Sequence, residues 1–322
     1  MSENEYNNYF ILFKLVRRKI LSILYIKDIK KSEEILSEKE KKLPQFMRNM
    51  LVILKIRLSI FQKNNNLIIL PIRENQELST KKIEKIIKNI MKKNVLKTVV
   101  LNKRLNNNEQ FKNILNSHNI DILNGRYLFR FMIFDIVNFI LDKKNKKLQD
   151  IELSIMVNEL DEINIKTILV FARKVKRLNI ITNHIGLFKR VEQSLYDEGI
   201  MIMVSNNKKK SLLKSDIIVN VDFVEENFKE YRLNNNCTIV NVSSDIEVYN
   251  KGFNGININN YNISYDNDII EKYSYEFDCK LLYESKLYGI SDFHKILTNI
   301  EYDNVIISEL IGNNGRMADF CV

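Results

Sequence analysis

The stretch "IELSIMVNELDEINI", residues 151–165, decides the interpretation of the second half of the chain. Its first part is apolar on both faces, as in a strand covered on both sides, and its second part has the periodicity of an amphipathic helix. A strand that runs directly into a helix is the repeating unit of a parallel α/β sheet. No glycine stands at the junction, where "NELDE" (158–162) is expected to form the turn.

Apolar runs alternate with amphipathic stretches on both sides of this unit, and this alternation predicts an α/β fold with two parallel-sheet lobes. Strands are expected at 67–72, 97–102, 120–124, 153–157, 178–182, 200–205, 216–223, 237–243 and 255–261. Helices are expected at 79–94, 109–118, 126–147, 160–176 and 187–198, with a short one at 209–215. The tail from about residue 268 is expected to be mainly helical, with one further apolar run at 304–312.

The first 66 residues are expected to be helical throughout, with breaks near "IKDIKKSEE" and Pro44. The predicted organisation is therefore a basic helical extension at 1–66 and a small α/β lobe at 67–147, which ends in the connecting helix 126–147. A Rossmann-like lobe with a helical tail is expected at 148–322.

Charge is distributed unevenly along the 322 residues. The chain carries a net charge of +10, but residues 1–150 hold 31 Lys and Arg against 15 Asp and Glu, whereas residues 151–322 hold 19 against 25. A basic half indicates nucleic acid, an anionic membrane surface or an acidic partner, or else a lysine-rich solvated face. No nucleic-acid-binding motif accompanies the charge.

Cysteine, histidine and apolar patterns narrow the class of protein. The three cysteines and three histidines are isolated in the sequence, so no disulfide framework or metal site is expected, and a reducing, cytoplasmic location is predicted. The apolar run at 9–26 is interrupted by Arg17, Arg18 and Lys19, so it is not expected to span a membrane. It fits a helix packed on its own domain or one lying on a membrane surface.

Two segments of the second lobe combine a predicted strand with a helix. They are "SLLKSDIIVNVDF" (211–223), in which Asp216 begins a strand that ends at Asn220, and "LNIITNHIGLFKRVEQSL" (178–195). Both resemble the NAD(P)-binding domains of the shikimate dehydrogenase and glutamyl-tRNA reductase group. The resemblance covers about residues 151–261. It implies a cofactor, NAD or NADP, bordered by residues at the strand ends: Asn158, Asn183, His184, Asn220 and Asp222.

The turn at 158–162 departs from this group. A pyrophosphate approaches the first helix closely only where a residue lacks Cβ and backbone N–H groups are free. Here Glu159, Asp161 and Glu162 bring three carboxylates to the turn. Each like-charge contact at about 4 Å costs on the order of 4 kcal/mol at an effective dielectric near 20. The usual phosphate-binding position is therefore predicted to be lost, and no catalytic acid–base pair is assigned.

Further candidate residues follow the strands of the first lobe and occur in two glycine-containing loops. Arg73 and Glu74, Lys103 and Arg104, and Arg126 follow its three strands, where they either bind a small anionic ligand or form part of a generally basic lobe. The second set comprises Gly255, Gly312 and Gly315. These glycines either line a cleft between the lobes or form tight turns.

Three functions remain open from the sequence. The first is a binding or regulatory protein of dehydrogenase ancestry that holds a small anionic ligand or a partner. The second is an NAD(P)-dependent oxidoreductase with an altered phosphate-binding turn. The third is a membrane-surface or nucleic-acid-associated protein that works through its basic first half.

Overall fold

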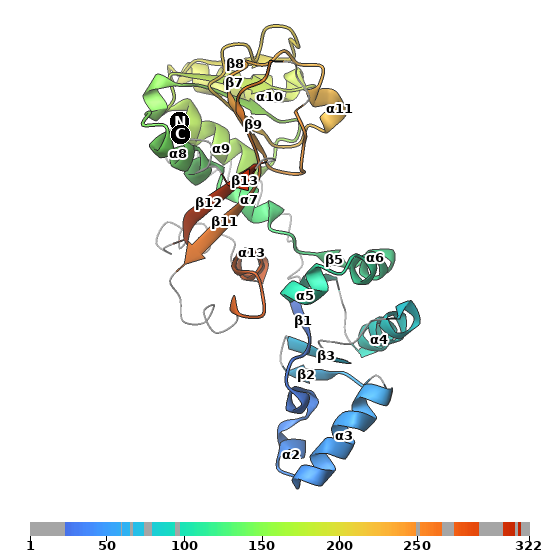
Figure 1. The fold of residues 1–322 in the computed structure, drawn as a ribbon. Coiled ribbons are helices and arrows are strands. Elements are labelled where there is room, and N and C mark those ends of the chain that lie inside the picture. Colours follow the sequence, from blue (N-terminus) through green and yellow to red (C-terminus); the bar gives the residue numbers. More distant parts are fainter. Residues whose placement is uncertain are drawn as a thin grey trace. The chain divides into compact units, whose positions relative to one another are not determined.

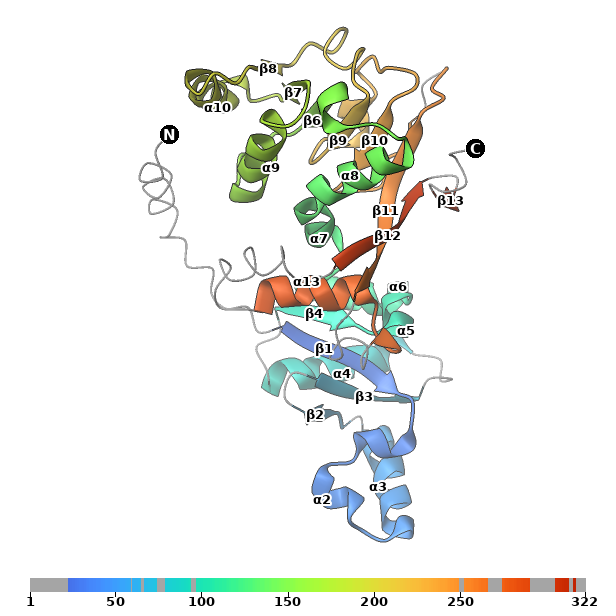
Figure 2. The same ribbon diagram turned by 90° about the vertical axis from the view of Figure 1, so that its left-hand side faces the viewer.

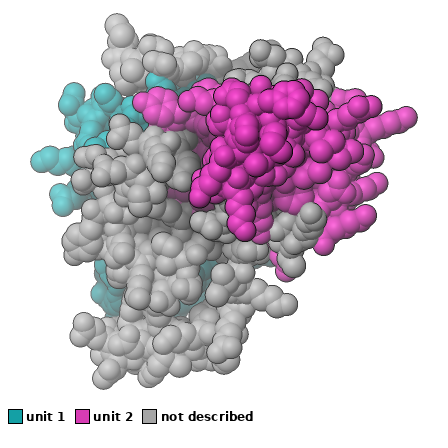
Figure 3. All heavy atoms as spheres, turned by 90° about the horizontal axis from the view of Figure 1, so that it is seen from below, with its two compact units in different colours: residues 1–15, 126–264, 305–322 teal, residues 16–125, 265–304 magenta. Residues whose placement is uncertain are grey.

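The structure, a computed structural model, describes residues 23–58, 60–64, 67–73, 79–93, 97–248, 252–265, 274–289, 305–312 and 315–316. These residues form two compact units (Figure 3). Among the described residues, unit 1 contains 126–264 and those from 305 onward, and unit 2 contains 23–125 and 265–289.

The sheet of unit 2 has five strands in the order β2-β3-β1-β4-β5. They are β1 (Ile23–Ile29), β2 (Gln62–Asn64), β3 (Leu67–Arg73), β4 (Thr98–Leu101) and β5 (Asp121–Ile122). All pairs are parallel except β2 with β3. The chain leaves β1 for β3 on one side and returns to β4 on the other (Figure 2), so strand order reverses between β1 and β4.

The expectation of a helical first segment is wrong for residues 23–29, which form β1, and for residues 62–64, which form β2. β1 is the central strand of the sheet, paired with both β3 and β4. Its apolar part, 23–26, is too short to show a periodicity that distinguishes a strand from a helix. The rest of the apolar run, 9–22, lies outside the described residues.

Helices cover both faces of the unit 2 sheet, as a parallel sheet requires. The α4 (Thr80–Lys93) and α6 (Glu109–Ser117) helices pack on one face, against Ile68, Leu70 and Val99. The α13 helix (Cys279–Gly289) packs on the other face, where Leu281 meets Val100. The α3 helix (Gln45–Leu58) packs beside the 3-10 helix η2 (Ser32–Ile35) and the short α2 (Glu38–Lys41). The short α5 (Lys103–Asn106) follows β4.

The sheet of unit 1 has eight strands in the order β13-β12-β11-β10-β9-β6-β7-β8. They are β6 (Glu152–Met156), β7 (Arg177–Ile181), β8 (Ile202–Ser205), β9 (Ile217–Asn220), β10 (Thr238–Asn241), β11 (Ile256–Tyr265), β12 (Val305–Gly312) and β13 (Gly315–Arg316). The strands from β6 to β11 are parallel, and their spatial order, third-second-first-fourth-fifth-sixth, is that of the dinucleotide-binding Rossmann fold. The Rossmann-like fold class predicted for the second α/β lobe is thus confirmed.

Most predicted helices of unit 1 are present (Figure 1). They are α7 (Arg126–Phe131), α8 (Ile133–Lys143), α9 (Glu162–Ala172) and α10 (Ile185–Asp197), with the short α11 (Glu225–Phe228) and the 3-10 helix η3 (Leu148–Asp150). The predicted helix 126–147 is divided into α7 and α8 at Met132. The predicted helix at 209–215 is wrong: the segment forms turns, and Leu212 instead bridges to Leu233.

Aromatic pairs and apolar side chains fill the core of unit 1. The Phe129 and Tyr261 rings stack with centroids 4.6 Å apart, and Phe134 contacts Phe171 at 5.4 Å. Met156, Ile218 and Ile239 of three adjacent strands belong to one further buried cluster. Within the described ranges, no helix has the length and apolar character needed to cross a bilayer.

Candidate functional site

The turn between β6 and α9 lies at the reversal point of the unit 1 sheet. β6 pairs with β7 on one side and with β9 on the other, so the carboxyl ends of these three strands meet there. In open parallel sheets, ligands bind outside the carboxyl ends at this reversal point. The predicted cofactor-contacting residues follow these strand ends.

Asp222 binds the backbone of this turn. Its Oδ1 and Oδ2 accept from the N–H of Asn158 at 2.9 and 2.8 Å, and its Oδ2 also accepts from the N–H of Glu159 at 2.9 Å. The Asn158 side chain donates to the same carboxylate at 3.3 Å. The N–H groups at the start of the turn therefore already hold an anionic group that belongs to the chain.

Asn158 also links the turn to the next strand end. Its Oδ1 accepts from the backbone N–H of Asn183 at 2.9 Å. The structure thus brings together three of the five predicted residues, Asn158, Asn183 and Asp222. His184 immediately precedes α10; it is exposed, and its backbone N–H donates to Thr182 Oγ1 at 3.0 Å.

Asn220 shapes the loop that carries Asp222. Its Oδ1 accepts from the N–H of Phe223, and its Nδ2 donates to the Phe223 carbonyl, both at 3.0 Å. The side chain is 2% exposed and also donates to Asn241 Oδ1 at 3.2 Å. An asparagine that bonds the backbone beyond it fixes a tight turn. Asn220 therefore positions Asp222 and is itself buried.

The first turn of α9 is closed by residues of the chain. Asp161 caps the helix by accepting from the N–H of Asn164 at 3.0 Å, and Asn164 Nδ2 donates to the Glu159 carbonyl at 2.7 Å. Arg130, which the sequence did not single out, donates to Asn164 Oδ1 at 3.1 Å, and its Nη2 lies 2.5 Å from Asp161 Oδ2. Its charge offsets that of Asp161, so repulsion at the turn is smaller than the sequence indicated.

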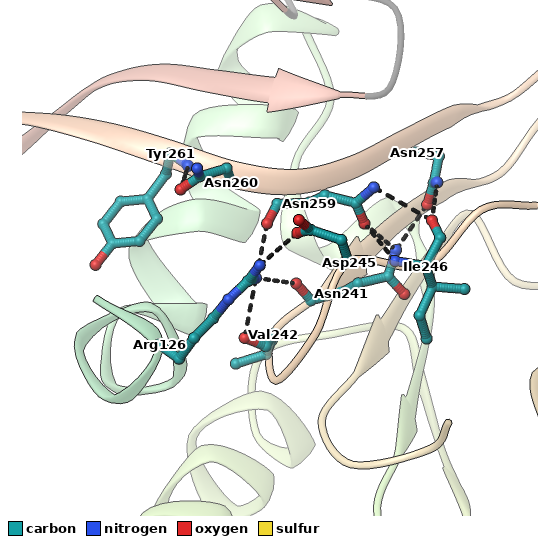
Figure 4. A network of polar contacts seen from close by, with 9 residues as sticks. All are labelled: Arg126, Asn241, Val242, Asp245, Ile246, Asn257, Asn259, Asn260 and Tyr261. Atoms are coloured by element: carbon teal, nitrogen blue, oxygen red, sulfur yellow. Dashed lines mark hydrogen bonds and ion pairs between the residues drawn. The ribbon is translucent and has the colours of Figure 1, made fainter. Parts of the chain in front are cut away.

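A second polar network lies at the carboxyl end of β10 and in the first half of β11 (Figure 4). Asn241 is fully buried, and its Nδ2 donates to Asn257 Oδ1 at 2.7 Å and to Asn259 Oδ1 at 2.8 Å. Asn257 and Asn259 in turn donate to the carbonyl of Ile246. The amide groups mainly bond one another and the backbone, which fixes the loop after β10.

Arg126 belongs to this network and not to the edge of the unit 2 sheet, where the sequence placed it. Its guanidinium donates to the carbonyls of Asn259 at 2.7 Å, Val242 at 3.3 Å and Asn241 at 3.4 Å, and it pairs with Asp245. The residue begins α7, which belongs to unit 1. Its N–H groups are thus directed at carbonyl oxygens of β10, of the loop that follows β10 and of β11.

The reversal point of the unit 2 sheet carries a second set of charges. Asp28, at the end of β1, accepts from Asn102 Nδ2 at 2.7 Å and pairs with Arg104. Lys27 Nζ lies 3.2 Å from Glu34 Oε2 and 2.9 Å from Glu276 Oε2. Burial alone would lower the pKa of Lys27, but its bonds and charge interactions with these glutamates raise the pKa above the ordinary 10.5.

Lys103 lies at the same strand end, and its ammonium group donates to the Ser274 carbonyl at 2.9 Å. Arg73 is the last residue of β3, and its backbone pairs with Ile29. The Arg73 side chain and the whole of Glu74 lie outside the described part of the chain. Lys103 and Arg104 follow β4 as expected, whereas Arg126 does not join them.

The three predicted glycines have local explanations. A Cβ on Gly255 would lie 2.0 Å from the Cys237 carbonyl oxygen, so only glycine fits there. Gly255 precedes β11 and lies at the amino edge of the sheet, opposite to Asp222. Gly312 and Gly315 face each other across the antiparallel pair β12 and β13.

Among the described residues, no group of three or more His, Cys, Asp or Glu side chains is arranged to hold a metal ion. Cys237 is buried, and burial raises the pKa of its thiol to about 12.

Comparisons with known proteins give distant structural likenesses only. No family model matches the sequence. None of the curated proteins matches it either. The L-tryptophan dehydrogenase from Nostoc punctiforme is 7% identical with a TM-score of 0.30, and the match covers 68% of this chain and 62% of the dehydrogenase. The chain thus spans less than two thirds of that protein.

Carbamoyltransferases give similarly low sequence identities and TM-scores. The ornithine carbamoyltransferase from Campylobacter jejuni is 12% identical with a TM-score of 0.24, covering 91% of this chain and 93% of that one. The ligand-free aspartate transcarbamoylase from Trypanosoma cruzi is 9% identical with a TM-score of 0.25, covering 68% of each chain. These values carry no inference about activity or ligand.

Proposed function

We propose that this chain is a non-classical binding or regulatory protein with a Rossmann-type unit that does not hold a dinucleotide at its first turn. The single observation that supports this function is the carboxylate of Asp222 on the N–H groups of Asn158 and Glu159. These are the groups with which a Rossmann turn binds pyrophosphate. The residues present therefore do not fit a dinucleotide bound in the usual manner.

Displacing Asp222 has a substantial free-energy cost. A hydrogen bond to a charged group contributes about 1.5–3 kcal/mol. Removing the carboxylate from two backbone N–H groups thus costs about 3–6 kcal/mol, which lowers the affinity for a competing phosphate by about 10²- to 10⁴-fold. The Asp161 and Glu162 carboxylates also repel a phosphate, although Arg130 offsets the first of them and Lys166 the second.

The second candidate is an NAD(P)-dependent oxidoreductase with an altered phosphate-binding turn. The complete Rossmann strand order of unit 1 favours it, as do Asn183 and His184 at the end of β7. In this case the cofactor would be held by groups other than the N–H groups that Asp222 occupies. No catalytic residue is proposed for this alternative.

Thermal unfolding of the full chain with NADH and with NADPH distinguishes the two candidates. We expect no change in Tm at millimolar cofactor for the wild-type protein. A rise of the size that ligand linkage requires would favour the oxidoreductase. Asp222→Gly, which frees the turn, is the informative variant; Asp245→Gly, which removes an exposed carboxylate near another strand end, is its matched control.

We also propose that a small anionic ligand of the regulatory protein binds at the carboxyl edge of the unit 2 sheet. Lys103 supports this, because the ammonium group contacts a neutral carbonyl at 2.9 Å while the neighbouring Lys27 and Arg104 face carboxylates. Inorganic phosphate is the probe. It should stabilise the wild-type chain and the control Lys97→Ala, at the opposite end of β4, but not Lys103→Ala.

A further inference from the structure

Residues 274–276, called the strap below, bind the carboxyl edge of the unit 2 sheet. Both oxygens of the Glu276 carboxylate lie 2.9 Å from Lys27 Nζ. The Glu276 carbonyl accepts from the backbone N–H of Lys103 at 2.9 Å, and the Ser274 carbonyl accepts from the Lys103 ammonium group at 2.9 Å. The strap is thus attached to the end of β4 and to the middle strand of the sheet.

The strap lies where a ligand of this sheet is expected. Open parallel sheets bind ligands outside the carboxyl ends of their strands, at the point where the strand order reverses, which is here between β1 and β4. The donors that the strap occupies are two ammonium groups and one backbone N–H. Such donors hold anionic groups in proteins.

Charge at this edge is balanced only while the strap is in place. The contacts of the strap and of the strand ends bring together three cations and three carboxylates: Lys27, Lys103, Arg104, Asp28, Glu34 and Glu276. Removing the Glu276 carboxylate from this set leaves one net positive charge. An anion is therefore attracted more strongly to the site once Glu276 has left.

The strap is held mainly by these polar contacts. Tyr275 is 79% exposed and adds little packing. Phe277, directly after the strap, is 1% exposed, and its ring lies edge-on to that of Tyr25 with centroids 5.8 Å apart. The strap can therefore leave while Phe277 stays in the core. An anion that replaces Glu276 keeps Lys27 paired, so the exchange avoids the cost of an unpaired buried charge.

We propose that the strap is an autoinhibitory contact, which a phosphate group displaces when it binds at the unit 2 sheet edge. The inference rests on the anion site proposed above and assigns the regulation of that site. Phosphate oxygens replace the Glu276 carboxylate at Lys27 and the two strap carbonyls at Lys103. Binding thereby moves residues 274–276 away from the sheet edge and changes the surface that the regulatory protein presents.

Calorimetric titration of the full chain with inorganic phosphate, at constant ionic strength, tests the competition. We expect Glu276→Gln to bind phosphate about fivefold more tightly than the wild type, because the competing charge is gone. The matched control Asp121→Asn, which removes an exposed carboxylate at the opposite edge of the sheet, should bind as the wild type does. Equal affinity of the wild type and Glu276→Gln overturns the strap alone. Absence of binding to all three chains overturns the anion site as well.

Limited proteolysis of the wild type measures the movement of the strap. Chymotrypsin needs a locally opened backbone, so phosphate should raise the rate of cleavage after Tyr275, followed by mass spectrometry. Cleavage after Tyr196, which is 63% exposed in α10, is the internal control and should not change. Unchanged or slower cleavage after Tyr275 at saturating phosphate overturns the proposal, because the strap would then stay in place or close over the anion.

Discussion

Asp222 and Asn158 are joined by a carboxylate that accepts twice from one backbone N–H, at 2.8 and 2.9 Å. Asp222 follows β9 and Asn158 follows β6, the two strands between which the order of the unit 1 sheet reverses. The contact therefore ties together the two halves of the Rossmann-type sheet. The Asp222 carboxylate also occupies the first backbone N–H group that a phosphate would contact in such a fold.

Removing the Asp222 carboxylate should destabilise unit 1. We expect Asp222→Ala to lower the free energy of unfolding by about 3–6 kcal/mol, because the N–H groups of Asn158 and Glu159 lose a charged acceptor. Glu226→Gln, an exposed change in α11, should stay within about 0.5 kcal/mol of wild type. Urea unfolding measures both, and an Asp222→Ala chain as stable as this control would show that the contact contributes little.

Arg126 should be important for stability, since its guanidinium binds two carbonyls at the end of β10 and one in the first half of β11. We expect Arg126→Lys to cost about 2 kcal/mol or more, because an ammonium group cannot reproduce the planar set of donors. Arg190→Ala, on the exposed side of α10, is the control and should be nearly neutral. Equal Tm values for the two variants would contradict the role assigned to the guanidinium.

Two glycines should respond in opposite directions to alanine. Gly255→Ala places a Cβ 2.0 Å from the Cys237 carbonyl oxygen and should destabilise the chain by about 3 kcal/mol. Gly186, in α10, has no atom within 4 Å of an added Cβ, so Gly186→Ala should stabilise by about 0.4–1 kcal/mol. Thermal unfolding of the pair checks the signs, and a neutral Gly255→Ala would contradict the close approach of β11 to β10.

The Cys237 thiol should be unreactive in the folded chain. Burial raises its pKa from 9.0 to about 12, so the folded state favours the protonated thiol. Its contribution to stability is complete below about pH 9 and is lost as the pH rises from there toward 12. Alkylation by iodoacetamide at pH 8, followed by mass spectrometry, should label Cys237 only in urea. Rapid labelling of Cys237 in the native protein would mean that the strand end opens.

The alternation of strands and helices predicted much of the fold because most strand–helix pairs are long enough to show their periodicity. β1 was taken for a helix because its first residues continue the apolar and basic run that starts at residue 9, and no turn residue marks where the strand begins. The turns around Leu212 were mistaken for a helix for a different reason, since their stability comes from the contact with Leu233, which is distant in the sequence.

In the candidate site, too, contacts between residues that are distant in the sequence could not be predicted from local patterns. Asn158, Asn183 and Asp222 were predicted from the resemblance to an NAD(P)-binding group, which implies cofactor contacts at the strand ends, and the three residues do lie together. Their mutual hydrogen bonds depend on which strands are adjacent, which no local pattern shows. Arg130 was missed because it lies in a different helix from Asp161, so the sequence argument counted the Asp161 charge without its partner.

The central claim is that Asp222 excludes a dinucleotide from the first turn of the Rossmann-type unit. Isothermal titration of the wild-type full chain with NADH measures this directly. We predict no saturable binding at millimolar NADH. The account would be contradicted if the wild-type chain bound NADH with a micromolar dissociation constant and Asp222→Gly left that constant unchanged or raised it. The cofactor would then bind without competition from this carboxylate.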